Sequence, residues 1–179
     1  METIEVVTEA VPASPADAKE LVLKMLDEGE QKERVCAESL CALIKAVGMA
    51  GKDLHYRAKG DAFYSEHLLA DLGWQVEKLT DDFIEVYYLG DKGWLPPTMD
   101  RIYAMAGGEV FTPMGDPDKA DDTSTAFWAK RLLTVCEKLV EKVEEAKGVL
   151  TSKAGTQAAL DEISKQALQV AGLLKRNLK

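Results

Sequence analysis

Apolar residues recur at helical spacing along most of this chain, and this periodicity restricts the possible folds more than any other feature. The clearest run has apolar side chains at positions 40, 43, 44 and 47. Residues three and four positions apart lie on one face of an α-helix, so the run predicts an amphipathic helix. No segment shows the alternation of apolar and polar residues that indicates a β-strand. We therefore predict an all-α protein.

Four long helices and one short helix are expected from the periodicity and from residues that begin or end helices. Ser14 and Pro15 form a typical helix start, because a hydroxyl caps a first turn that begins with proline. Whether Gly29 divides this first helix stays open. The expected helices run from 14 to the connection at 56–61, from 63 to 90, from 98 to 105, from Asp122 or Thr123 to 143, and from 155 to 174.

The connection between the second and third long helices is the most informative one. Four of the six prolines lie between residues 90 and 120, which predicts a long irregular segment. A simple up-down bundle needs only a short loop there. We therefore expect a ferritin-like four-helix bundle, with a long crossover between helices two and three. The bundle is assigned to residues 14–179, and residues 1–13 to an acidic flexible tail.

The charge of the chain limits its partners. With 22 basic and 31 acidic side chains the net charge is −9, which repels phosphate backbones and makes DNA binding unexpected. No apolar run approaches the ~20 residues of a membrane span, and no signal peptide is visible, so we expect a cytoplasmic protein without membrane contact. The three cysteines lack a metal-binding spacing, and we expect reduced core residues.

The chain's only two histidines stand twelve residues apart, and carboxylates follow the second one at helical spacing. His67 and Asp71 lie one turn apart and can share a metal ion. Glu85 is about 21 Å beyond Asp71 along a helix, too far for the same ion. A second subunit, antiparallel about a two-fold axis, would bring its own acids to these histidines, a ligand set suited to iron(II). The six candidate ligands are His55, His67, Asp71, Asp81, Asp82 and Glu85.

A plainer interpretation stands beside the metal site. In so acidic a chain, a stripe of carboxylates also fits a solvated helix face, and a histidine is often a packing residue. The joint spacing of both histidines with Asp71 is rarer by chance than either feature alone, and it favours the metal site. The Glu-x-x-His motif that places ligands inside a single bundle does not occur in the chain, which excludes that kind of site.

The run from Leu54 to His67, with Asp71 beyond it, resembles the DNA-protection-during-starvation proteins (Dps, the mini-ferritins). The shared features are Leu-His-aromatic, a Lys-Gly turn, a phenylalanine, a second histidine twelve residues after the first, and an aspartate four residues later. The resemblance implies a ferroxidase, in which peroxide or oxygen oxidises iron(II) at sites between two subunits of a dodecameric shell that stores iron. Trp74 is a candidate for the oxidisable ring near the iron, since Tyr56 stands where the family commonly has tryptophan.

The family's closing pair, an aspartate and a glutamate four residues apart, is matched in one of two ways. Asp82 lies eleven residues after Asp71 as in the family, but Val86 follows four residues later. Asp81 and Glu85 keep the four-residue step with a shift of one residue. Both aspartates stay candidates. The alternative function is a ferritin-like structural or adaptor protein without catalysis.

Overall fold

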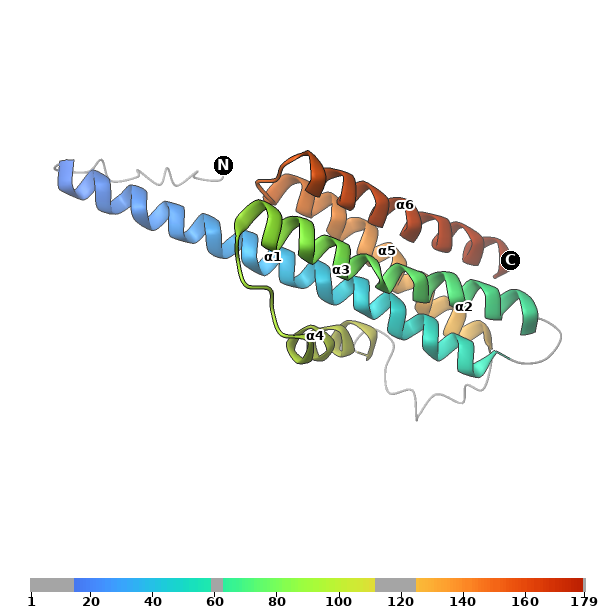
Figure 1. Cartoon of the computed structure of the whole chain (residues 1–179). Helices are drawn as coiled ribbons and strands as arrows, with labels where there is room; N and C mark the ends of the chain where they lie inside the picture. Colours follow the sequence, from blue (N-terminus) through green and yellow to red (C-terminus); the bar gives the residue numbers. More distant parts are fainter. Residues whose placement is uncertain (1–14, 59–62, 112–124, 179) are drawn as a thin grey trace, which may run out of the picture.

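The computed structural model describes residues 15–58, 63–111 and 125–178, and throughout these ranges the regular structure is helical, without strands (Figure 1). The all-α prediction is confirmed. None of the helices in these ranges combines the length and the apolar character that a membrane crossing requires. The elements are α1 (Pro15–Arg57), α2 (Phe63–Glu77), α3 (Leu79–Phe83), the π-helix η1 (Ile84–Lys92), α4 (Met99–Phe111), α5 (Thr125–Val149) and α6 (Ala154–Asn177).

The observed helices follow the expected ones with changes at their ends. α1 runs through Gly29 without a break, and the expected second helix is divided into α2, α3 and η1. α4 and α5 both continue further than the apolar pattern suggested, to Phe111 and Val149. The acidic tail at 1–13 lies outside the described residues, as do the expected helix start at Ser14 and parts of two connections, 59–62 and 112–124.

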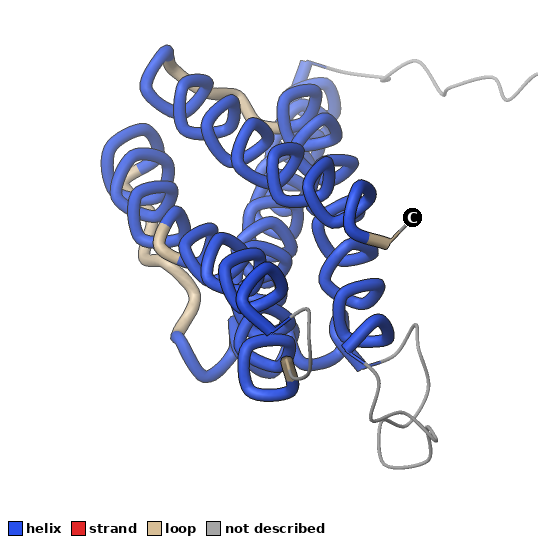
Figure 2. The backbone as a smooth tube through the Cα atoms, turned by 90° about the vertical axis from the view of Figure 1, so that its right-hand side faces the viewer, coloured by secondary structure: helices blue, strands red, loops and turns tan. Residues whose placement is uncertain are grey.

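The helices α1, α5 and α6 lie side by side with a further rod, the continuous series α2, α3 and η1 (Figures 1 and 2). α1 packs on α2 and α5, while α6 packs on α5 and on the rod of α2, α3 and η1. α4 lies outside this group and packs mainly on α1. The chain is therefore a helical bundle with an additional short helix on one side.

The core between the rods is apolar and receives side chains from every rod. The three cysteines belong to it: all are buried and none forms a disulfide, as expected. Burial raises the pKa of Cys41 and of Cys136 to about 12, because a thiolate would lose its hydration there. Fully buried core residues include Leu40, Ile44, Leu54, Phe83, Leu132, Leu139, Leu160 and Ile163.

Glycines allow α1 and α2 to cross at very short range. A Cβ atom on Gly51 would lie 2.8 Å from the carbonyl oxygen of Ala70 and 2.9 Å from the backbone nitrogen of Trp74. A Cβ on Gly48 would lie 2.5 Å from the Glu77 carboxylate. A larger residue at either position would therefore clash with α2. At Gly51 the nearest atoms are backbone atoms, which no rotamer change can move.

The helical repeat of the second rod changes at Lys78. The Lys78 amide donates to the carbonyl of Gln75, and the Asp81 amide donates to the carbonyl of Lys78, each at 3.2 Å. These bonds span three residues rather than four, so the rod is wound more tightly there than an α-helix. Beyond them the π-helix η1 begins, and Val86 faces Gly155 of α6. Residues on the two sides of Lys78 therefore do not keep one α-helical phase.

Carboxylates hold together the end of the bundle where η1 finishes. Glu33 of α1 accepts hydrogen bonds from the hydroxyls of Tyr87, at 3.1 Å, and Thr151, and it forms an ion pair with Lys92. Asp91 accepts hydrogen bonds from the backbone nitrogen of Lys153, at 2.9 Å, and from the hydroxyl of Thr156, at 2.6 Å. Asp91 therefore caps the start of α6 from another helix.

Candidate metal centre

Three of the six predicted ligands meet where the C-terminal end of α1 passes the first turns of α2. One ligand atom from each of His55, His67 and Asp71 lies within 4.8 Å of the other two. The two imidazole ring centroids are 3.6 Å apart, and the His55 Nδ1 atom lies 2.9 Å from Oδ1 of Asp71. All three side chains are half-buried, so ions can reach them from solvent. The cluster is small enough to surround one metal ion.

The close helix crossing explains why these side chains meet. His55 lies one turn after Gly51 on α1, and Asp71 directly follows Ala70, whose carbonyl oxygen contacts Gly51. His67 is one turn before Asp71 on the same side of α2. The site is therefore built from two rigid helices that touch at their backbones, and its geometry depends on the distance between them.

The chemistry of the three groups suits a divalent transition metal. Imidazole and carboxylate ligands accept iron(II), zinc and manganese. The Nδ1 atom of His55 is hydrogen-bonded to the Asp71 carboxyl group, and the second ring nitrogen, Nε2, is not used in that contact. Three protein ligands leave coordination positions open, either for small molecules or for ligands from elsewhere.

The other three predicted ligands lie further along the same rod. Asp81 and Asp82 are in α3 and Glu85 is in η1, and all three side chains are exposed. Glu85 is fourteen residues beyond Asp71, which corresponds to about 21 Å of helix. The described part of one chain therefore brings together His55, His67 and Asp71, and it does not bring these acids to them.

A hollow of about 240 Å³ opens beside Asp71. Its lining includes Trp74, Gln75 and Lys78, and the ammonium of Lys52 lies 5.2 Å from the centre of the Trp74 ring. Trp74 is 45% exposed and lines this hollow together with Asp71, which it follows by one helical turn. A molecule or side chain seated in this hollow would contact the indole and a carboxylate of the candidate site.

A buried charge network beside the hollow was not foreseen from the sequence. Glu77 is 7% exposed, and its carboxylate lies 3.4 Å from Lys45, which is 5% exposed, and 3.2 Å from Lys52. The hydroxyl of Tyr103 on α4 donates to the same carboxylate at 3.0 Å. Burial acts to raise the pKa of Glu77, but the hydrogen bonds from Lys52 and Tyr103 and the charge of Lys45 lower it overall. The network ties α1, α2 and α4 together.

Glu66 is a second unforeseen carboxyl group near the site, directly before His67 in the sequence. Its Oε2 atom is buried without a hydrogen-bond partner, and burial raises the pKa of the group against the effect of a hydrogen bond with Thr125. Because Glu66 is directed toward α5, it is not part of the three-residue cluster.

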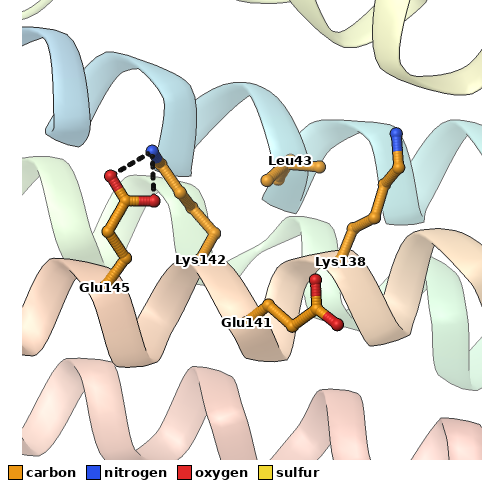
Figure 3. A pocket seen from close by; sticks show the side chains of 5 residues that line it. All are labelled: Leu43, Lys138, Glu141, Lys142 and Glu145. Carbon is orange, nitrogen blue, oxygen red and sulfur yellow. Dashed lines mark hydrogen bonds and ion pairs between the residues drawn. The ribbon is translucent and has the colours of Figure 1, made fainter. Parts of the chain in front are cut away.

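Another hollow, of about 230 Å³, is lined by residues of α1 and α5 (Figure 3). Leu43 of α1 lines it together with alternating charges from α5, and Lys142 is paired with both carboxylate oxygens of Glu145 at 3.0 Å. Lys138 and Glu141 complete the lining with one further charge of each sign. These balanced surface charges provide no histidine and no buried polar group, so the cluster around His55 is the stronger candidate.

No family model, curated protein or solved structure matches this chain.

Proposed function

We propose that the protein binds iron(II) through His55, His67 and Asp71 and promotes its oxidation by peroxide or oxygen. The observation that carries this proposal is the convergence of two imidazoles and a carboxylate within 4.8 Å at a glycine-lined helix crossing. Iron is the substrate of this reaction. Each of two iron(II) ions gives one electron to hydrogen peroxide, which takes up two protons and leaves as two molecules of water.

A second copy of the chain completes the ligand set in this proposal. If the rods of two subunits pack antiparallel about a two-fold axis, the acids beyond Lys78 in one subunit lie opposite His67 and Asp71 of the other. Each dimer then has two equivalent sites. The exposure of Asp81, Asp82 and Glu85 supports this arrangement, because ligands supplied to a partner have to lie on the surface of the single chain.

Asp81 and Glu85 are the proposed pair from the second subunit. In an ideal α-helix Asp82 would share the face of Asp71, because eleven residues make about three turns. Around Lys78, however, two hydrogen bonds span three residues instead of four, so each residue turns further about the helix axis there. The ten residues from Asp71 to Asp81 then make about three turns, and Asp81 rather than Asp82 shares the face of Asp71. In addition, the residue four positions after Asp82 is Val86, which faces Gly155 of α6 and cannot bind a metal ion.

The proposal extends to a ferritin-like architecture. α1, the rod of α2, α3 and η1, α5 and α6 would be its four long helices, with α4 inside the crossover between the second and third. The packing of α1 on α2 and α5, and of α6 on α5 and the rod, supports this assignment. In a dodecameric shell the net charge of −9 would favour the entry of cations.

Anaerobic iron(II) titration followed by peroxide tests the proposal. The wild type is expected to bind iron(II) and to oxidise it faster than a protein-free solution, and Asp71→Asn and His67→Ala are expected to lose this acceleration. Asp161→Asn is the matched control, because Asp161 is an exposed α6 carboxylate paired with Lys147. Equal oxidation rates for the wild type and His67→Ala would refute the site. Competition with zinc and manganese establishes the metal preference.

A comparison of three further variants tests the ligands from the second subunit. Asp81→Asn and Glu85→Gln are expected to slow oxidation at least tenfold, while Asp82→Asn keeps most of the activity. The reverse order for the two aspartates would assign Asp82 and refute the phase argument. Light scattering on the same samples measures the mass of the assembly and separates a shell from a dimer.

The alternative function is that of a ferritin-like adaptor without catalysis. Its support is the exposed apolar surface of α4 and the segment before it, where Leu95 is 88% and Met99 is 41% exposed. Such a surface is typical of a protein-binding face when its residues are contiguous. Absence of iron(II) binding, together with an intact helical fold, would favour this alternative.

A further inference from the structure

Three large apolar side chains are exposed at the two ends of the stretch of the second rod that carries the candidate ligands. Tyr64 and Leu68, one turn apart at the start of α2, are 80% and 64% exposed. Leu89, near the end of η1, is 54% exposed. Asp71, Lys78 and the candidate acids lie between them along the rod. Along the rod, the exposed side chains therefore begin with an apolar pair, continue through the polar candidate ligands and the exposed Trp74, and end with one apolar side chain.

This order is self-complementary for an antiparallel pair. Residues i and j of an isologous contact meet twice, because the two-fold axis exchanges the subunits. If Asp71 lies opposite Asp81 of the second copy, the two-fold axis crosses the rod at the level of residue 76. Residue 89 of one copy then falls opposite residue 63 of the other. If it lies opposite Asp82 instead, residue 89 falls opposite Tyr64. Either ligand assignment brings Leu89 of one copy to the patch formed by Tyr64 and Leu68 of the other.

The charges in the middle of this stretch fit the same pairing. Two carboxylates facing each other across the axis repel when no metal is bound. In either register Lys78 of one copy falls opposite position 74 or 75 of the other, at the hollow lined by Asp71, Trp74, Gln75 and that copy's own Lys78. The Trp74 ring and the Asp71 carboxylate attract the incoming ammonium, which offsets part of the repulsion between carboxylates, while the resident Lys78 opposes it.

We propose that Leu89 of a second copy packs on Tyr64 and Leu68 of the first, and the reverse, so that two apolar contacts close the ends of the interface. This inference rests on the proposed two-fold metal site and adds the residues that hold its two halves together. The apolar contacts exclude water from the ends of the interface, while Lys78 occupies the hollow beside each site. The surface is thus an interface between two copies of this chain, held by residues that are not ligands.

A disulfide experiment tests the proposed contact directly. Positions 64 and 89 are 25 residues apart on one rod, about 37 Å, whereas disulfide-bonded Cα atoms lie within about 7 Å. A disulfide in the double variant Tyr64→Cys/Leu89→Cys therefore has to join two chains. Mild oxidation is expected to give a covalent dimer on a non-reducing denaturing gel. The two single variants and the wild type, whose own cysteines are buried, are expected to stay monomeric on that gel.

Substitution by charge gives a second measurement. Leu89→Asp is expected to weaken self-association at least tenfold in sedimentation velocity, because the carboxylate would have to be buried against Tyr64 and Leu68. Leu95→Asp is the matched control, since Leu95 is more exposed and lies outside the proposed contact. Retention of helical circular dichroism in both variants excludes unfolding as the cause.

The outcomes separate this inference from the proposed function. A monomeric double variant whose new thiols react freely would overturn the contact, even if iron(II) oxidation depends on His67. A covalent dimer that neither binds nor oxidises iron(II) would support the contact and overturn the iron site. Equal association of the Leu89→Asp and Leu95→Asp variants would also overturn the contact, because it would mean that Leu89 is not buried between the copies.

Discussion

The substitution Gly51→Ala changes the distance between the two helices that form the metal site. Its new methyl group would lie 2.8 Å from the carbonyl oxygen of Ala70, about 0.6 Å closer than ordinary van der Waals contact. It would also lie 2.9 Å from the backbone nitrogen of Trp74. Because both neighbours are backbone atoms, α2 has to move away from α1 as a whole. His55 and Asp71, one turn or less from this contact, would separate with the helices.

The expected loss of stability follows from two opposing terms. Overpacking of this kind costs about 1–3 kcal/mol, while alanine in place of a helical glycine contributes up to about 1 kcal/mol. Gly172→Ala in α6 carries only the second term, since nothing lies within 4 Å of its added Cβ. The free energy of unfolding of Gly51→Ala should therefore be about 1–3 kcal/mol lower than that of Gly172→Ala.

Urea denaturation measures this difference, and cobalt(II) titration followed by absorption spectroscopy measures its effect on the site. Gly51→Ala should bind cobalt(II) at least tenfold more weakly than the wild type, whereas Gly172→Ala should bind it equally well. Two variants of equal stability would refute the close-crossing argument. A destabilised Gly51→Ala protein with unchanged metal affinity would show that the site does not depend on the helix separation.

Three further substitutions test other parts of the fold. Hydrogen bonds from Lys92, Thr151 and Tyr87 outweigh burial and lower the pKa of Glu33, so its contribution to stability is complete above about pH 4.5 and is lost as the pH falls through the lowered pKa. In urea denaturation Glu33→Gln should therefore be less stable than the wild type at pH 7, and the difference in stability should shrink below about pH 4.5. A stability difference that does not change with pH would contradict the lowered pKa of Glu33. Glu77→Leu leaves Lys45 buried without its carboxylate and should lower the free energy of unfolding by about 3–5 kcal/mol in the same assay. Adding Lys45→Met should recover this stability, and failure to recover it would argue against the ion pair. Asp91→Ala removes the cap from α6 and should lower the free energy of unfolding by about 1 kcal/mol, and unchanged amide hydrogen exchange in the first turn of α6 would count against that role.

The helices were predictable because their information is local. The spacing of apolar residues along 40–47 reflects the repeat of an α-helix, and the same repeat appears in the other long helices. The division of the second rod at Lys78 was not predictable, because residues 63–89 keep an apolar pattern across it. Beyond it η1 packs on α6, where Val86 lies next to Gly155, and such a contact between distant residues leaves no local pattern in the sequence.

The candidate site was predictable in part for the same reason. His67 and Asp71 are neighbours on one helix, and the structure adds His55 across the crossing, as the sequence had suggested. The partners of Glu77 were not predictable: Lys45 is 32 residues away, and neither residue interrupts the helical pattern around it. The role of Gly51 was also hidden, because glycine inside a helix has no side chain that reports which neighbour approaches it.

The sequence by itself determined the helical class of this protein and a pair of candidate ligands one turn apart, because both follow from the repeat of a single helix. Only the tertiary structure decided how closely α1 and α2 approach, which carboxylates became buried, and how the rod beyond Lys78 is turned. These features depend on contacts between residues far apart in the chain. No local pattern of side chains specifies them, since each results from the packing of several helices at once.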